Sequence, residues 1–261
     1  MTLVVRVAAV TAALSLAVAG CGAPNESPAR DSTGDAGGGK LVVFAAASLK
    51  KSFTEIGEQF KTDNPGSDVE FTFAGSSDLV TQLTQGAPGD VFASADTKNM
   101  DKAAQADLVA ADPVNFASNR LTIVTAQGNP KNVASFKDLS RPGLSVVVCA
   151  PQVPCGSAVQ KVQKATGVQL DPVSEESQVT DVLNKVTSGE ADAGLVYVTD
   201  ALGAGDKVTA VPFPESAEAV NTYPIAVLKQ ARDRVLAGKF VDLVIGEAGQ
   251  KVLDAAGFAK P

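Results

Sequence analysis

Four short polar turns in this sequence each follow an apolar run and precede the start of an expected helix. They contain, in order, Ser48, Ser76, Cys155-Gly156 and Ser177-Gln178. The first turn of a helix presents free backbone N–H groups and the positive end of the helix dipole, so such turns can bind anions. In open α/β sheets, ligands also gather at the carboxyl ends of the strands, where turns of this kind meet. For any one turn taken alone, ordinary helix capping is the simpler alternative.

The residue types that the chain lacks exclude most enzymatic chemistry. It contains no histidine and no tryptophan. Ser-His-Asp and Cys-His nucleophilic sites are therefore excluded in their usual forms, as are histidine-based zinc sites. The sequence has no G-x-S-x-G turn, and no Asp or Glu pair stands out as an acid–base couple. A carboxylate-based mechanism is not excluded by these absences. We nevertheless expect no catalytic residues, no directly coordinated metal and no cofactor.

The N-terminal residues have the pattern of an export signal. After the basic Arg6, the run Val7–Ala19 is apolar but too short to span a membrane. It ends in Val18-Ala19-Gly20-Cys21, which resembles the bacterial lipobox. Residues 1–20 are thus predicted to be a lipoprotein signal peptide, with Cys21 as the lipidated residue. The alternative is an ordinary secretory signal followed by an unrelated cysteine.

Composition and charge define the rest of the chain broadly. Residues 21–39 are rich in Gly, Pro, Ser and Asp, and they are predicted to form a flexible tether. The folded part then begins near Lys40, outside the cell membrane and anchored to its outer face through the lipid on Cys21. The formal net charge of −7 argues against nucleic acid as a partner, and we expect a monomer.

Two further cysteines, Cys149 and Cys155, lie six positions apart. In an exported protein such a pair is a disulfide candidate. The alternative is a pair of thiols packed as small hydrophobic side chains.

Strand-like and helix-like segments alternate along the folded part, which predicts an α/β fold with mostly parallel sheets. Leu41–Ala47 has the pattern of a buried strand, with Ser48 expected as the N-cap of the next helix. Other expected strands are 69–73, 90–95, 121–125, 145–149, 193–198 and 225–228, and a helix is expected from Pro154 to about Thr166.

Five segments, in order, resemble motifs of the molybdate-binding (ModA) family, and the resemblance spans the whole folded part from Lys40 to Pro261. Five motifs in order are far more specific than a single glycine pattern. The segments are Val43–Leu49, Phe73–Leu79, Gly86–Asp96, Val153–Gly156 and Gly194–Tyr197.

The resemblance implies a type II periplasmic-binding-protein fold, in which two α/β lobes joined by two crossing strands close on a tetrahedral oxyanion. The first lobe would comprise residues 40–119 and 224–261, and the second lobe residues 120–223. The implied function is capture of molybdate, and usually tungstate, outside the membrane and delivery to the permease of an ABC importer.

Transferred position by position, the resemblance implies five ligand-binding residues. Ser48 and Ser76 would each donate through a hydroxyl and a backbone N–H. Cys155 and Val179 would each donate through a backbone N–H, and Tyr197 through its phenolic hydroxyl. The family commonly has alanine at the position of Cys155, which leaves the N–H in place but puts the shape of the loop in doubt. Tyr223 is interpreted as structural.

A donor-only site of this kind suits an anion that carries no proton. Four helix starts at about +0.5 each sum to roughly +2, the charge that a dianion such as molybdate requires. Phosphate keeps a proton part of the time, and that proton would lack an acceptor at a cost of roughly 1–3 kcal/mol. Sulfate differs from molybdate only in size. The alternatives are therefore the same fold with sulfate, phosphate, ferric ion or an organic acid, and, from a different class, a lipid-anchored exported hydrolase.

Overall fold

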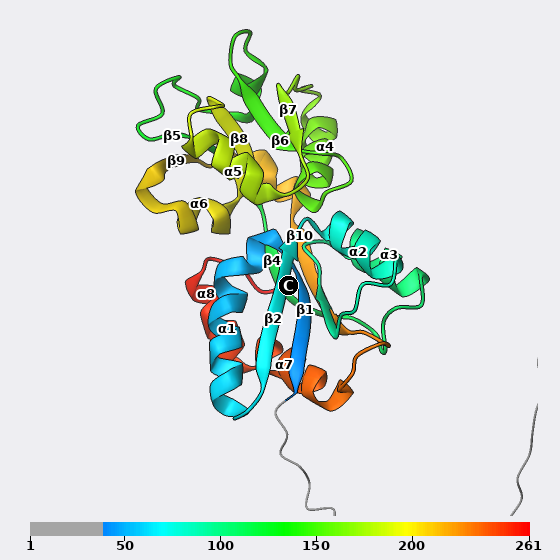
Figure 1. Cartoon of the computed structure of the whole chain (residues 1–261). Coiled ribbons are helices and arrows are strands. Elements are labelled where there is room, and N and C mark those ends of the chain that lie inside the picture. Colours follow the sequence, from blue (N-terminus) through cyan, green and yellow to red (C-terminus); the bar gives the residue numbers. More distant parts are fainter. Residues whose placement is uncertain (1–38) are drawn as a thin grey trace, which may run out of the picture. The chain divides into compact units, whose positions relative to one another are not determined.

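The computed structural model describes residues 39–261, which form two α/β lobes, each with its own five-stranded sheet (Figure 1). The predicted signal peptide, Cys21 and all but the last residue of the predicted tether lie outside the described residues. Within residues 39–261, no helix combines the length and the hydropathy needed to cross a membrane.

The first lobe contains the two ends of the described chain, coloured blue to cyan and orange to red in Figure 1. Its strands are β1 (Lys40–Ala46), β2 (Asp68–Ala74), β3 (Val91–Ala93), β4 (Val114–Asn119) and β10 (Asn221–Val227). Its helices are η1 (Ala47–Leu49), α1 (Lys50–Asp63), α2 (Ser76–Thr84), α3 (Thr97–Gln105), α7 (Arg234–Ile245) and α8 (Glu247–Ala255).

The second lobe is formed by the middle of the chain. Its strands are β5 (Leu121–Ala126), β6 (Val146–Cys149), β7 (Ser174–Glu176), β8 (Ala193–Tyr197) and β9 (Val208–Val211). Its helices are η2 (Phe136–Ser140), α4 (Pro154–Thr166), α5 (Val179–Thr187), α6 (Val198–Ala204), η3 (Gly205–Lys207) and η4 (Pro214–Ala219).

The two sheets repeat one layout. The strand order is β2-β1-β3-β10-β4 in the first lobe and β7-β6-β8-β5-β9 in the second. In each sheet the first two neighbouring pairs are parallel and the last two are antiparallel, so both sheets are mixed. The fourth strand, β10 or β5, is in both cases the strand that directly follows a crossing between the lobes. The carboxyl ends of the parallel strands therefore carry the turns into η1, α2, α4, α5 and α6.

The chain crosses between the lobes twice. The first crossing is at Arg120, between β4 and β5, and the second lies between η4 and β10. β10 already pairs with β4 at Asn221, opposite Asn119. Residues 221–223 therefore already belong to the sheet of the first lobe, whereas the first lobe was expected to resume at residue 224.

Alternation along β1 places side chains on both faces of the first sheet. Val43 and Ala45 pack with Phe53 of α1 and Phe240 of α7 in one core cluster, whereas Phe44 packs with the buried side chains of α2 and α3 in another. A strand covered by helices on both faces is apolar throughout, as the run from residue 41 to 46 is. The second lobe has a core cluster of its own.

Candidate functional site

All five residues predicted to bind the ligand line one small cavity between the lobes. The space open at its centre is about 10 Å³, of the order that one water molecule needs. The full lining is Ala46, Ala47, Ser48, Ala74, Gly75, Ser76, Ala95, Val153, Pro154, Cys155, Val179 and Tyr197. None of these described residues carries a charged side chain, so any charge in the cavity must be balanced by dipoles.

Four of the five residues lie in the first turn of a helical segment. Ser48 is the second residue of η1, Ser76 opens α2, Cys155 is the second residue of α4, and Val179 opens α5. The backbone N–H groups at these positions have no carbonyl one turn earlier within their own helix. Donors from two helical segments of each lobe therefore converge on the same cavity.

These four helical starts have no side-chain cap. By contrast, Asp96 caps α3, Asp233 caps α7 and Ser135 caps η2. The expectation that Ser48 is an N-cap was wrong: the chain turns into η1 one residue earlier, and Ala46 precedes that turn. Ordinary capping therefore does not account for the polar turns around the cavity.

Two hydroxyl groups that line the cavity accept hydrogen bonds from other groups of the protein. Ser76 Oγ accepts the backbone N–H of Ala95 at 3.0 Å, and Tyr197 Oη accepts the side-chain amide of Asn221 at 2.8 Å. An N–H group can only donate, so each of these hydroxyls keeps its own proton for another partner. Ser48 Oγ lies 3.0 Å from Tyr223 Oη, and either hydroxyl can be the donor of that bond.

Burial reinforces the protonated state of the two tyrosines near the cavity. Desolvation raises the pKa of Tyr197 well above its ordinary value, and it also raises the pKa of Tyr223. Both phenols therefore stay protonated at neutral pH and can donate. Asp200 lies close behind them, and its carboxylate accepts the backbone N–H of Tyr197 at 3.0 Å. Desolvation raises the pKa of Asp200 to about 7.

A disulfide joins Cys149, at the end of β6, to Cys155 in the first turn of α4, with an S–S distance of 2.00 Å. The loop between them folds back closely on the end of the strand. A Cβ atom at Gly156 would lie 2.0 Å from the carbonyl oxygen of Ala150, so only glycine fits there. The cross-link and the glycine together fix the start of α4 against the end of β6.

Two residues next to the cavity were not identified from the sequence. Tyr223 was interpreted as structural, yet its hydroxyl contacts Ser48. Asn221 was not singled out at all, although its amide reaches Tyr197. The one available signal was position, because Asn221 directly precedes the expected crossing at Thr222-Tyr223.

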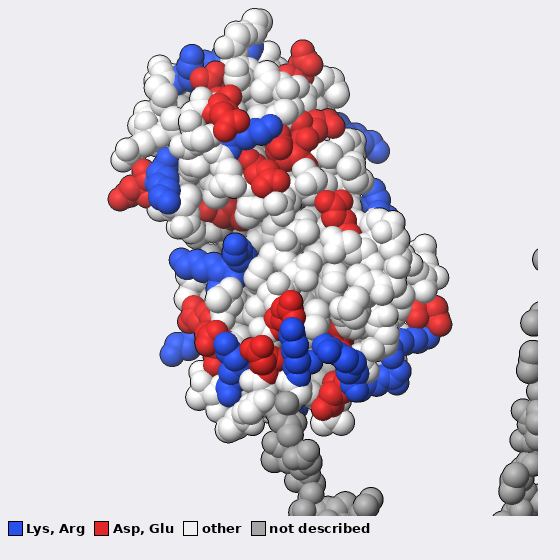
Figure 2. All heavy atoms as spheres, in the orientation of Figure 1, with Lys and Arg blue, Asp and Glu red and all other residues white. Residues whose placement is uncertain are grey.

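An open groove of about 490 Å³ adjoins the cavity and shares Ala47 and Ser48 with it. Lys50 and Lys51 of α1 line this groove on the first lobe. Figure 2 shows basic side chains beside the boundary between the lobes, over the N-terminal end of α1, and basic and acidic groups interspersed over the rest of that face.

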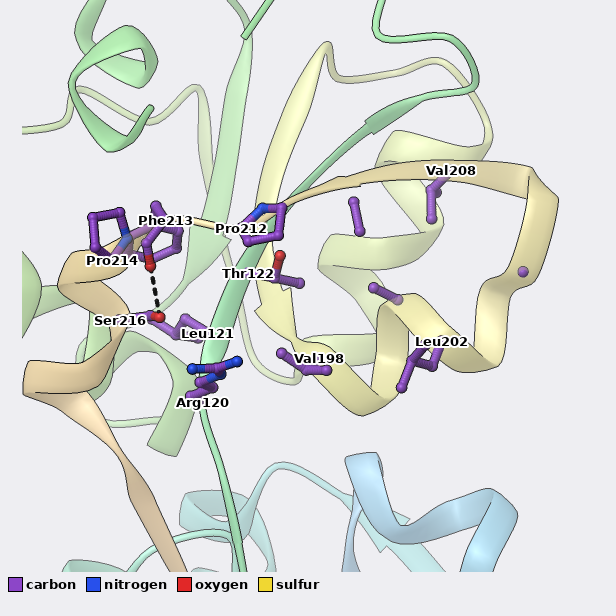
Figure 3. A pocket seen from close by; sticks show the side chains of 13 residues that line it. Arg120, Leu121, Thr122, Val198, Leu202, Val208, Pro212, Phe213, Pro214 and Ser216 are labelled. Atoms are coloured by element: carbon purple, nitrogen blue, oxygen red, sulfur yellow. Dashed lines mark hydrogen bonds between the residues drawn. The ribbon is translucent and has the colours of Figure 1, made fainter. Parts of the chain in front are cut away.

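A wider cavity of about 600 Å³ lies in the second lobe and contains none of the five predicted residues (Figure 3). Leu121, Val198, Leu202 and Phe213 contribute to a largely apolar lining, with Arg120 at one side. Such a lining does not suit a small dianion. Among residues 39–261, no group of three or more Cys, Asp or Glu side chains is placed to hold a metal ion.

Comparison with known proteins gives consistent matches. Residues 41–259 match the family model described as bacterial extracellular solute-binding protein. The molybdate-binding protein ModA of Mycobacterium tuberculosis is 58% identical over 253 residues, which cover 97% of this chain and 96% of that protein.

Two solved structures share the fold. The periplasmic molybdate-binding protein of Azotobacter vinelandii superposes with a TM-score of 0.74 at 23% identity, covering 85% of this chain and 99% of that one. The sulfate-binding protein SubI of M. tuberculosis gives 0.73 at 20% identity, covering 85% and 86%. Both pairs are below the identity at which a shared ligand could be inferred, so they support the fold alone.

The matched family consists of solute-binding proteins and not of enzymes. With its two-lobed fold, a family match over residues 41–259 and 58% identity along nearly its full length, the chain belongs to the bacterial extracellular solute-binding proteins and, among them, to the ModA family.

Proposed function

We propose that this protein captures molybdate, and also tungstate, in the cavity between its lobes and delivers the anion to the permease of an ABC importer. One observation supports this most strongly. Uncapped helix starts from both lobes, together with the hydroxyls of Ser48, Ser76 and Tyr197, surround a cavity without a charged side chain.

The donor set suits a fully deprotonated tetrahedral oxyanion. Molybdate offers acceptor oxygens and no proton, and the cavity offers O–H and N–H donors from Ser48, Ser76, Cys155, Val179 and Tyr197. Oriented backbone dipoles supply the positive potential, so the protein needs no lysine or arginine at the site despite a net charge of −7. The net charge affects solubility and long-range steering more than the field inside the cavity.

Similarity to a named relative favours molybdate over the alternative ligands. The 58% identical relative is named as a molybdate-binding protein. Sulfate is the second candidate, because sulfate is also a proton-free dianion that suits a site of donors only. Both ligands would use the same donors, and the size of the closed cavity would separate them.

Calorimetric titration of the mature protein with molybdate, tungstate, sulfate and phosphate tests the proposal. We expect saturable one-to-one binding of molybdate and tungstate, and weaker binding of sulfate and phosphate. Equal affinities for sulfate and molybdate would make the named ligand wrong while leaving the binding-protein family intact. Absence of binding to all four anions would remove the proposed function altogether.

We further propose that a lipid on Cys21 anchors the protein to the outer face of the cell membrane. The support is the sequence pattern Val18–Cys21. Expression of the full chain and of Cys21→Ser in a bacterial host, followed by membrane fractionation and mass analysis of the N-terminal peptide, tests it. A wild-type protein without a lipid mass on Cys21 would contradict the anchor but not the binding function.

A further inference from the structure

Asn221 lies at the second crossing between the lobes and is buried, with 4% of its surface exposed. It is the first residue of β10 and pairs with Asn119, the last residue of β4. Both crossings therefore carry a buried asparagine at the same level, next to the cavity.

The side-chain nitrogen of Asn221 has three acceptors within hydrogen-bonding distance. They are the carbonyl oxygen of Ala95 at 2.8 Å, the phenolic oxygen of Tyr197 at 2.8 Å and the carbonyl oxygen of Pro154 at 3.3 Å. Ala95 belongs to the first lobe, whereas Pro154 and Tyr197 belong to the second. One amide group therefore ties both lobes together immediately behind the cavity.

The same three partners adjoin three of the proposed donors. The backbone N–H of Ala95 bonds to Ser76 Oγ, Pro154 directly precedes Cys155 at the start of α4, and Tyr197 is itself a proposed donor. A change at Asn221 would consequently act on the binding site and not only on the hinge.

The two carbonyl partners fix which way the amide faces. A carbonyl oxygen can only accept, so the atom of Asn221 that meets Ala95 and Pro154 must be the nitrogen. The nitrogen can only donate, so Tyr197 Oη must accept from it. The single phenolic proton of Tyr197 is then directed away from Asn221.

We infer that Asn221 is a positioning residue that holds the Tyr197 hydroxyl as a donor toward the oxyanion. The inference rests on the proposed function and specifies its substrate class: oxyanions that bring acceptors and no proton. A hydrogen phosphate or hydrogen arsenate brings a proton that needs an acceptor, and the Asn221 amide competes with that proton for the Tyr197 oxygen.

The second neighbour of Tyr197 offers a second route for its proton. Its ring lies 6.0 Å from that of Tyr223, centroid to centroid, and the Tyr223 hydroxyl contacts Ser48. If Tyr197 donates to Tyr223, then Tyr223 donates to Ser48, whose own proton is left for the cavity. By the first route the proton left for the cavity is that of Tyr197, and by the second route it is that of Ser48.

A double-mutant cycle tests whether Asn221 acts through that hydroxyl. Molybdate affinity would be measured calorimetrically for the wild type, Asn221→Ala, Tyr197→Phe and the double variant. We expect Asn221→Ala to weaken binding roughly 10- to 100-fold in the wild-type background, the range for losing an oriented donor to a charged ligand, and only about 2-fold in the Tyr197→Phe background. Equal losses in both backgrounds would overturn the inference and leave Asn221 as a purely structural residue of the hinge.

Asn99→Ala is the matched control. It removes another buried asparagine, whose side-chain nitrogen donates to Asp96 Oδ1 at 2.9 Å, and its effect should be the same in both backgrounds. Should Asn221→Ala fail to fold, Asn221→Ser gives the same cycle, because serine can donate to one carbonyl but is too short to reach Tyr197.

The selectivity between molybdate and phosphate provides a second measurement, which a purely structural defect would leave unchanged. Once freed from Asn221, the Tyr197 hydroxyl can rotate and accept from a protonated anion. The ratio of molybdate to phosphate affinity at pH 6 should therefore fall about 10-fold in Asn221→Ala, and an unchanged ratio would contradict the inference. A wild type that does not bind molybdate would instead refute the proposed function, so the two failures are distinguishable.

Discussion

At the scale of single residues, the cavity has two kinds of hydrogen-bond donor: side-chain hydroxyls and backbone N–H groups. Ser76 accepts a bond from Ala95 behind it and has its proton left for a ligand, whereas Val179 can contribute only its N–H. Substitution with alanine removes a hydroxyl but leaves a backbone N–H in place. The two kinds of donor should therefore respond differently to the same change.

We predict that Ser48→Ala and Ser76→Ala each weaken molybdate binding by roughly 1–3 kcal/mol, because each loses a donor to a charged ligand. Val179→Ala is the control and should cost much less, since its side chain does not reach the ligand as a donor. Calorimetric titration measures all three. Losses of equal size would contradict the division of roles.

Asp200 makes the stability of the protein depend on pH. Its pKa is raised from 3.8 to about 7 by burial, so between these values the folded chain retains a proton that the unfolded chain has lost. The contribution of Asp200 to stability therefore decreases as pH rises from about 4 to about 7 and is constant above that. Its titratable neighbours Tyr197 and Tyr223 have raised pKa values and stay protonated over this range.

Replacing Asp200 by asparagine should flatten the pH dependence of the melting temperature between pH 4 and pH 7, relative to the wild type. Asparagine retains an oxygen to accept the N–H of Tyr197 but does not ionise. Asp206→Asn, at an exposed position on η3, serves as the control. An Asp200→Asn profile parallel to that of the wild type would show that this carboxyl does not titrate as described.

At the scale of elements, α1 begins with charges that are unfavourable for a helix. Lys50 and Lys51 occupy its first turn, where the helix dipole disfavours cations, and both line the groove that leads to Ser48. Their position is better explained by attraction of an incoming anion than by helix stability.

We predict that Lys50→Gln/Lys51→Gln slows molybdate association several-fold at low ionic strength, with little change in dissociation. Stopped-flow measurements across a salt series would show the difference shrinking as the charges are screened. Lys61→Gln/Lys98→Gln removes the same charge from positions outside the groove and should leave the rate nearly unchanged. If both double variants slowed association equally, only net charge would matter.

The disulfide between β6 and α4 is the second feature at this scale. It closes a loop of seven residues, Cys149–Cys155, and by chain entropy such a loop contributes about 2 kcal/mol. Cys149→Ala/Cys155→Ala should lower the free energy of unfolding by about that amount and weaken molybdate binding modestly, because the Cys155 N–H remains. Denaturation of the double variant and of the reduced wild type would be compared, and an unchanged midpoint in both would contradict the role.

The elements that the sequence predicted well are those with a strong local signal. Helix α4 has the predicted bounds, Pro154–Thr166, because proline opens it and Gly167 in a left-handed conformation ends it. Strand β4 was missed, since its sequence from Val114 to Asn119 is half polar and only its last four residues are buried. Local periodicity does not reveal a strand with so mixed a pattern.

The proposed donors of the candidate site could be predicted because they were transferred, position by position, from the resemblance to the ModA family. Ser48, Ser76, Cys155, Val179 and Tyr197 meet at one cavity, as the family resemblance implied. The residues behind them were not predictable, because their role depends on how the lobes meet. For example, Asn221 contacts a carbonyl 126 positions earlier in the chain, and no local pattern distinguishes such an asparagine from a surface one.

At the scale of the whole molecule, the proposed site has donors from both lobes around one cavity. η1 and α2 present their donors from the first lobe, and α4 and α5 present theirs from the second. At Gly75 the two lobes approach so closely that a Cβ atom there would lie 2.1 Å from the carbonyl oxygen of Ser177. An oxyanion between them would bridge the lobes and suppress their separation.

Hydrogen exchange can detect this bridging directly. We predict that saturating molybdate slows amide exchange roughly 10-fold or more in peptides covering η1, α2, α4 and α5 together, because binding stabilises the closed arrangement over its openings. Peptides covering α3 and α7, whose starts are capped by their own aspartates, should change little. Protection confined to the helix starts of one lobe would mean that the anion binds to that lobe alone, and the closing of two lobes on one dianion would then be wrong.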